Sequence, residues 1–170
     1  MQEILLKGNI KAYVSKEDYK TVSCHTWYPR FEPSGICYAV TFINNRSVLL
    51  HRFIMKPQIG KVVDHKDGDG LNNTRENLRV CSRQENRFNS RKRKDSKFKY
   101  KGVGYNVKVQ WFGRRKKKII KNKEFPFMAK ITAKGKQYFL GVFKTEEAAG
   151  RAYDEAAKKY HGEYARLNFG

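Results

Sequence analysis

Four polar side chains between residues 64 and 86 have the types and spacing that suit hydrolysis of a phosphate ester: Asp64, His65, Asn77 and Asn86. The Asp64 carboxylate and the Asn86 amide offer oxygen ligands for one Mg²⁺ or Mn²⁺ ion. A neutral His65 imidazole can take a proton from water near pH 7, and the Asn77 amide oxygen can accept its other ring N–H. The cation would neutralise charge that grows on the phosphoryl and leaving oxygens.

Residues 61–86 predict a strand, a loop, a second strand and a helix that would bring these four side chains together. The pattern at 61–63 delivers Asp64 and His65 to the end of a strand, and the loop KDGDGLNNT follows it. The side chains of residues 77–81 alternate between two faces, which predicts a second strand. Ser82 and Glu85 have the spacing of a capping box, which opens a helix with Asn86 in its first turn.

The stretch VVDHKDGDGLNNTRENLRVCSRQEN resembles the HNH nuclease motif, the ββα-metal finger, in its phage homing-endonuclease form, and the resemblance covers residues 51–90. It implies Asp64 and Asn86 as metal ligands, His65 as general base and Asn77 as the residue that orients the base. It also implies a homing endonuclease from a phage or mobile element, which acts on double-stranded DNA in the cytoplasm of a bacterial host.

Two other interpretations of this segment are weaker. Asp64, Asp67 and Asp69 are spaced closely enough for a calcium loop, but Arg75 stands where an EF-hand requires its bidentate Glu. Asp67 and Asp69 are therefore expected to form turns. An inactive nuclease fold is disfavoured because all four polar positions are retained. Nearby His51 is expected to be a packed structural residue.

The charge distribution points to a polyanionic partner. The formal net charge is +21, and sixteen of the 37 lysines and arginines lie within residues 87–124. A solvated linker or a nuclear-localisation run would share this composition. We favour a segment that follows DNA phosphates, with affinity that falls steeply as salt rises. Outside the C-terminal sheet, the expected DNA contacts are Arg52, Arg87, Asn89, Arg91, Lys92, Arg93, Lys94, Arg114, Arg115 and Lys116.

The C-terminal residues predict a hairpin, 127–132 and 137–143, followed by a helix that Thr145 caps and Gly162 ends. Alanines and tyrosines at spacings of three and four form one apolar stripe on this helix. The segments YKGV, FMAKI, YFLGVFKTEEAAGRAYDEAA and ARLNF resemble the apetala-two (ethylene-response) DNA-binding domain, with a basic insertion near 106–124. The alternative is a purely structural appendage.

That resemblance implies a three-stranded sheet whose open face enters the major groove. The side chains that would face DNA are Lys101, Lys130, Thr132, Gln137 and Phe139. Gly104, Thr132 and Gln137 stand where the family often has base-reading arginines. Phe139 stands where Trp is usual. The family's base preference is therefore not transferred to this chain.

The expected fold class is α+β, in four parts: a small β-rich region at 1–50, the HNH motif at 51–90, a basic linker at 91–99 and the apetala-two-like domain at 100–170. Within 1–50, Ser15 begins a helix, and Asn44-Asn45 turns between strands at 38–42 and 47–50. No apolar run can span a membrane, and the start lacks an apolar signal core. Three cysteines without a CxxC pair disfavour disulfides and a zinc knuckle, and favour the cytosol.

We expect a monomer with no protein partner that cuts one strand per visit. The rival function is a non-catalytic DNA-binding regulator that uses the same sheet and basic segment. A second rival is an RNA-acting protein, because aromatic residues are interleaved with the basic ones at 100–112.

Overall fold

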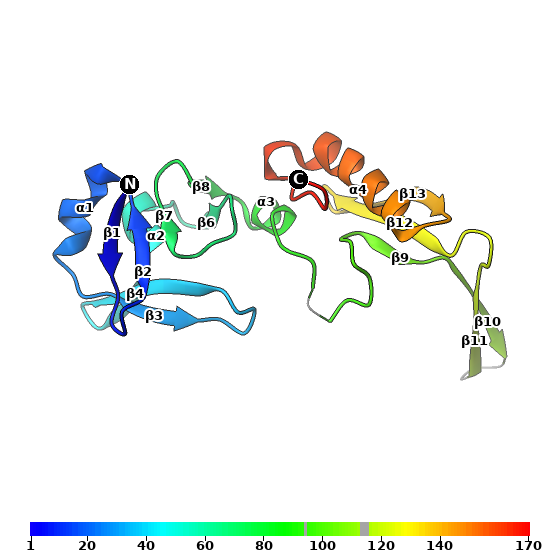
Figure 1. Ribbon diagram of the computed structural model, residues 1–170, viewed down its shortest axis with the longest axis horizontal. Coiled ribbons are helices and arrows are strands. Elements are labelled where there is room, and N and C mark those ends of the chain that lie inside the picture. Colours follow the sequence, from blue (N-terminus) through cyan, green and yellow to red (C-terminus); the bar gives the residue numbers. More distant parts are fainter. Residues whose placement is uncertain (94, 113–115) are drawn as a thin grey trace. The chain divides into compact units, whose positions relative to one another are not determined.

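The structure is a computed structural model that describes the backbone of residues 1–93, 95–112 and 116–170, and the side chains of all these except 109–112 and 116–118. The chain divides into two compact units, Met1–Asn89 and Ser90–Gly170 (Figure 1). Both combine small sheets with helices, which confirms the α+β class.

The first unit contains three small sheets and three helices. Its strands form sheets in the orders β1-β2-β7, β3-β4-β5 and β6-β8. In chain order the elements are β1 (Gln2–Leu5), β2 (Lys11–Val14), α1 (Lys16–Ser23), β3 (Tyr28–Phe31), β4 (Cys37–Ile43), β5 (Arg46–Leu49), α2 (Leu50–Met55), β6 (Val62–His65), β7 (Asn72–Asn73), β8 (Leu78–Cys81) and α3 (Arg83–Phe88).

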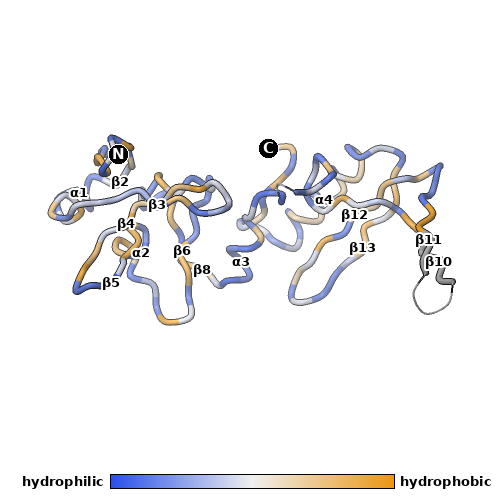
Figure 2. Tube along the Cα trace, turned by 90° about the horizontal axis from the view of Figure 1, so that it is seen from below, coloured by the Kyte–Doolittle hydropathy of each residue, from blue (hydrophilic) through white to orange (hydrophobic). Residues whose placement is uncertain are grey.

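One hydrophobic core runs through the whole first unit. Val22 and Trp27 from the N-terminal region pack in the same cluster as Leu50, Val63 and Leu78. The predicted boundary at residue 50 therefore lies inside this unit, because the core needs apolar side chains from both sides of it. Figure 2 shows the hydrophobic stretches along β4, α2 and β6, with hydrophilic segments between them.

Two local features position the nuclease motif. Asn44 and Asn45 have φ values of 49° and 58°, the left-handed conformation that a tight turn between β4 and β5 requires. β2 pairs in parallel with the short β7, so that Val14 lies beside Asn73. This pairing ties the loop after His65 to the N-terminal sheet.

The second unit is a three-stranded sheet covered by one helix. The sheet order is β13-β12-β9, and β10 and β11 form a separate hairpin within the predicted insertion. The elements are β9 (Val103–Tyr105), β10 (Val107–Phe112), β11 (Lys116–Lys121), β12 (Phe127–Ala133), β13 (Lys136–Phe143), α4 (Glu146–His161) and the 3₁₀ helix η1 (Gly162–Tyr164).

Helix α4 lies along one face of this sheet (Figure 1). Its buried Tyr153, Ala156 and Ala157 pack in one cluster with Ile131 of β12. Thr145 caps the helix by accepting a hydrogen bond from the Ala148 N–H at 3.1 Å, as predicted. The opposite face of the sheet carries no helix within the described residues of this unit.

Candidate active site

Strands β6 and β8 and helix α3 build the predicted site. β6 ends in Asp64 and His65, which lie beside Arg79 and Leu78 of β8. Ser82 Oγ accepts from the Glu85 N–H at 3.2 Å, and Glu85 Oε2 accepts from the Ser82 N–H at 2.7 Å. This reciprocal capping box, predicted from the sequence, fixes where α3 begins.

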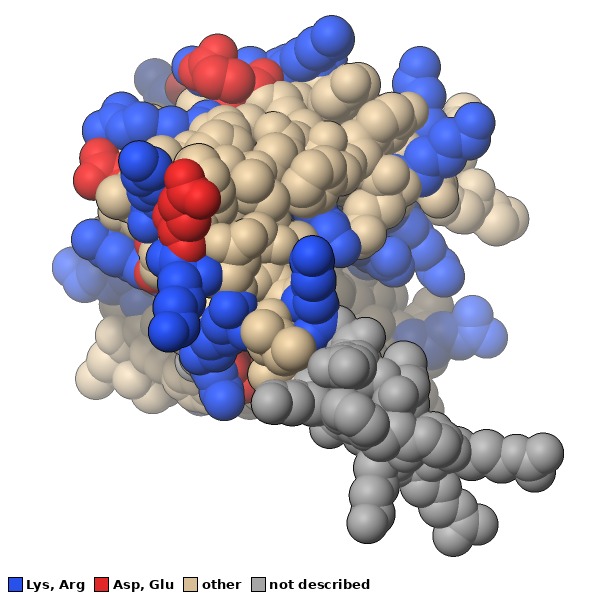
Figure 3. Space-filling view, turned by 90° about the vertical axis from the view of Figure 1, so that its right-hand side faces the viewer, with Lys and Arg blue, Asp and Glu red and all other residues tan. Residues whose placement is uncertain are grey.

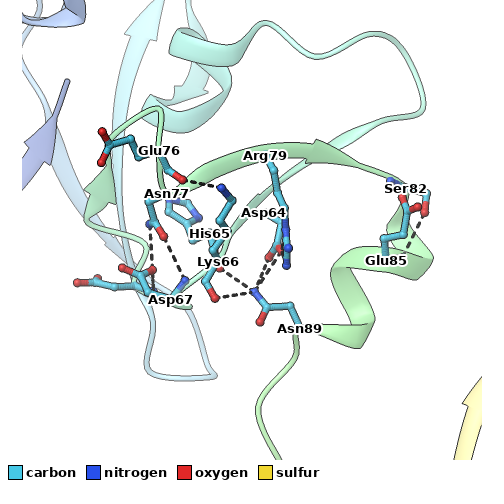
Figure 4. Close-up of polar contacts among 11 residues, drawn as sticks. Asp64, His65, Lys66, Asp67, Glu76, Asn77, Arg79, Ser82, Glu85 and Asn89 are labelled. Atoms are coloured by element: carbon cyan, nitrogen blue, oxygen red, sulfur yellow. Dashed lines mark hydrogen bonds and ion pairs between the residues drawn. The ribbon is translucent and has the colours of Figure 1, made fainter. Parts of the chain in front are cut away.

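The Asp64 carboxylate is buried and held from two sides (Figure 4). Arg79 donates to Oδ2 from Nε at 2.8 Å and from Nη2 at 2.7 Å. Asn89 Nδ2 lies 3.0 Å from Oδ1 and 2.8 Å from the His65 carbonyl oxygen. A buried carboxylate needs such partners, because burial without them is costly. Asn89, expected to contact DNA, is placed inside the site at 8% exposure.

The His65 imidazole is oriented by an asparagine that the sequence analysis missed. His65 Nε2 lies 3.3 Å from Asn73 Oδ1, and Asn73 Nδ2 donates to the Gly70 carbonyl oxygen at 3.2 Å. The Asn73 amide oxygen therefore faces the ring, so Nε2 carries the hydrogen and Nδ1 carries the lone pair. Burial lowers the pKa of His65 below 6.5, although Asn73 and the nearby carboxylates oppose the shift.

Asn77, expected to orient His65, instead stabilises the loop. Its Nδ2 donates to Asp67 Oδ1 at 2.9 Å and to the Asn72 carbonyl oxygen at 2.7 Å. Its Oδ1 accepts from the Asp67 N–H at 3.1 Å. Asp67 and Asp69 also accept backbone N–H groups two residues along the chain, as expected of turn-forming residues.

Asn86 lies on α3 with its side chain exposed. Its backbone N–H donates to the Ser82 carbonyl oxygen at 3.0 Å, and in the described chain no hydrogen bond joins its amide to Asp64. The structure therefore brings together Asp64, His65, Asn73 and Asn89. Among the described residues, no group of three or more His, Cys, Asp or Glu side chains is arranged to hold a metal ion.

The open face of the second unit carries most of the side chains expected to face DNA there. Lys130 pairs with Phe139, and Thr132 pairs with Gln137, across β12 and β13. All four lie opposite the buried face of β12, and Phe139 is 61% exposed. Lys101 is placed differently: its Nζ donates to the Ser90 carbonyl oxygen at 2.8 Å. Burial, followed by the nearby Arg166, lowers the pKa of Lys101 to about 8.

The remaining expected DNA contacts are basic residues in and after the motif. Arg52, Arg87, Arg91 and Arg93 are exposed, and Lys92 is half-buried. Lys94, Arg114 and Arg115 lie outside the described residues, and Lys116 is described only as backbone of β11. Figure 3 shows that Lys and Arg predominate over Asp and Glu on the face it presents.

β6, β8 and α3 follow one another in the ββα order that the HNH resemblance implies, and comparison with known proteins agrees. The family model described as HNH endonuclease matches residues 49–88. A protein of Acanthamoeba polyphaga mimivirus, named as an uncharacterized HNH endonuclease, L560, is 32% identical over 163 residues. The match covers 92% of this chain and 74% of that relative. The chain belongs to the HNH endonuclease family and is a DNA endonuclease.

The C-terminal region also matches plant transcription factors. Two AP2-like ethylene-responsive transcription factors of Arabidopsis thaliana, At1g79700 and At1g16060, are 58% and 55% identical over 38 residues. These matches cover 22% of this chain and 12% and 11% of the two relatives. The apetala-two resemblance is thereby confirmed. No solved structure matches the chain.

None of the helices in the described ranges is long and apolar enough to span a membrane.

Proposed function

We propose that this endonuclease is a metal-dependent homing nuclease that hydrolyses one phosphodiester bond of duplex DNA per visit. The observation that carries the proposal is that Asp64 and His65 lie at the end of β6, where Asn73 of β7 faces the His65 imidazole. The viral source of the 32% identical relative supports a mobile-element origin. The protein then acts as a monomer in the cytoplasm of its host cell.

His65 is the general base in this mechanism. Asn73 holds the hydrogen on Nε2, which leaves the Nδ1 lone pair to accept a proton from water. The water oxygen forms a bond to phosphorus while the bond to the 3′ oxygen breaks, which gives a 5′-phosphate and, after protonation, a 3′-hydroxyl. The lowered pKa keeps the imidazole neutral near pH 7. A positioned base supplies a rate factor of roughly 10²–10⁴.

Asp64 and Asn86 would hold the divalent cation, Mg²⁺ or Mn²⁺. A carboxylate and an amide oxygen are hard donors that fit such an ion, and Arg79 and Asn89 keep the Asp64 carboxylate in place. When bound, the cation would stabilise the negative charge on the phosphoryl and leaving oxygens. The chain's own contribution is to hold the Asp64 carboxylate beside the base.

The second unit supplies DNA affinity in this proposal. Lys130, Thr132, Gln137 and Phe139 form its docking face, and the basic segment after α3 binds phosphates without sequence preference. The match to AP2-like transcription factors supports this role.

The test is cleavage of supercoiled plasmid by the full chain with Mg²⁺, with Mg²⁺ plus excess EDTA, and by Asp64→Ala with Mg²⁺. Nicked circles should form only in the first reaction. Cleavage that survives EDTA would contradict metal dependence. Metal-dependent cleavage by Asp64→Ala at the wild-type rate would remove Asp64 from the site.

A further inference from the structure

Two aromatic side chains outside the four predicted catalytic positions lie against the His65 ring. The His51 ring of α2 lies 5.0 Å from the His65 ring, centroid to centroid, with the planes at 86°. The Tyr38 ring of β4 lies 5.7 Å from it, at 51°. The Tyr38 and His51 rings are themselves 5.5 Å apart. We infer that Tyr38 and His51 are positioning residues that hold the imidazole in its reactive orientation.

This inference rests on the proposed role of His65 as base. The bond from Nε2 to Asn73 fixes one atom of the imidazole but leaves the ring plane free to tilt about it. The edge-to-face contact with His51 and the tilted contact with Tyr38 restrict that movement from two directions, because aromatic pairs have preferred geometries. Since only 5% of His65 is exposed, the ring has little room to turn away from these contacts.

Gly70 gives independent support, because it brings the catalytic loop onto β4. A Cβ on Gly70 would lie 2.6 Å from Tyr38 Cδ1 and would also overlap the Cys37 carbonyl oxygen. Only glycine permits this approach. The Gly70 carbonyl oxygen accepts the hydrogen bond from Asn73 Nδ2. One glycine therefore sets the distance from the loop to Tyr38 and anchors the asparagine that orients His65.

The chemistry of the two rings suits a neighbour that must take a proton. Burial lowers the pKa of His51 to about 3, so His51 stays neutral and adds no positive charge beside the base. Burial raises the pKa of the Tyr38 hydroxyl, so Tyr38 is uncharged as well. Neither ring therefore adds charge beside His65.

The test compares paired variants that keep or remove each ring: Tyr38→Phe with Tyr38→Leu, and His51→Phe with His51→Leu. Removing a ring should lower kcat for plasmid nicking by about 100-fold, while keeping a ring should hold kcat within about threefold. DNA affinity should stay unchanged in all four variants. Tyr19→Leu, on the half-exposed α1 residue of the same unit, is the matched control and should cleave like wild type.

A second readout does not depend on cleavage. In nitrogen-15 NMR of the DNA-free protein, with the His65 signals assigned by His65→Gln, wild type and the two Phe variants should show the Nε2–H form alone. The Leu variants should show a mixture of both tautomers, because a ring that tilts out of line with Asn73 Oδ1 weakens the bond that holds the hydrogen on Nε2. Because each ring is tested by its own pair of variants, misfolding of one variant leaves the other pair to decide.

The outcomes separate this inference from the proposed function. If His65→Ala cleaves like wild type, His65 is not the base, and both ideas fail. If His65→Ala is inactive but the Leu variants keep wild-type kcat and a single tautomer, the positioning role alone is overturned. A Leu variant that loses DNA affinity while keeping kcat would make that residue a DNA contact instead.

Discussion

Replacing His51 with Phe should change how the stability of the first unit depends on pH. His51 is 7% exposed, and burial lowers its pKa from 6.5 to about 3 in the folded protein. Between pH 6.5 and about pH 3, His51 binds a proton in the unfolded chain but not in the folded chain. The free energy of unfolding must therefore fall as the pH drops below 6.5, and Phe at this position removes that contribution.

The size of the effect follows from the pKa difference. The pKa of His51 is 6.5 in the unfolded chain and about 3 in the folded chain. This difference lowers the free energy of unfolding by about 2 kcal/mol between pH 7.5 and pH 5.0. Histidines other than His65, which contacts His51, contribute equally in both proteins, so the comparison isolates His51 and its contact with His65. His51→Phe should therefore lose about 2 kcal/mol less than wild type over this interval.

Urea unfolding at the two pH values measures this difference. Trp27 is buried in the first unit, where its Nε1 donates to the Val22 carbonyl oxygen, so its fluorescence reports on that unit. Trp111, in β10 of the second unit, should be replaced by Phe in both proteins to leave one signal. If wild type and His51→Phe lose the same stability between pH 7.5 and 5.0, His51 is not held neutral by burial.

Three other substitutions test the site. Asn73→Ala removes the acceptor for His65 Nε2, so kcat for nicking should fall by roughly 10²-fold in single-turnover assays. An unchanged kcat would show that Asn73 does not set the tautomer of His65. Asn89→Ala removes a hydrogen-bond donor to the buried Asp64 carboxylate, so urea unfolding should show a free energy of unfolding that is lower by about 1–3 kcal/mol. Asn86→Ala alters an exposed residue, so it should change stability by less than about 0.5 kcal/mol yet abolish metal-dependent nicking. Equal stability losses for these last two would contradict the placement of Asn89.

The parts of the site that were predicted from the sequence depend on interactions between residues close together in the chain. The strand that ends in Asp64 and His65, the capping box at Ser82 and Glu85, and the turn-forming role of Asp67 all depend on residues within a few positions of one another. The C-terminal hairpin and helix were predicted for the same reason, because their apolar spacing and caps are local signals.

The contacts that the sequence did not predict depend on how separate segments of the chain pack together. Asn73 is placed by the parallel pairing of β7 with β2, about sixty residues earlier, and nothing in the loop LNNT distinguishes it from its neighbours. Asn77 has the expected residue type and spacing, but its amide is hydrogen-bonded to Asp67 and not to His65. His51 is packed, as expected, and its packing partner is His65.

The most direct test of His65 as the general base compares wild type with His65→Ala on the same supercoiled plasmid with Mg²⁺. DNA binding is measured in parallel by gel shift. Wild type should convert the plasmid to nicked circles, whereas His65→Ala should bind with the same affinity and leave it intact. Nicking by His65→Ala at the wild-type rate would show that His65 is not the general base.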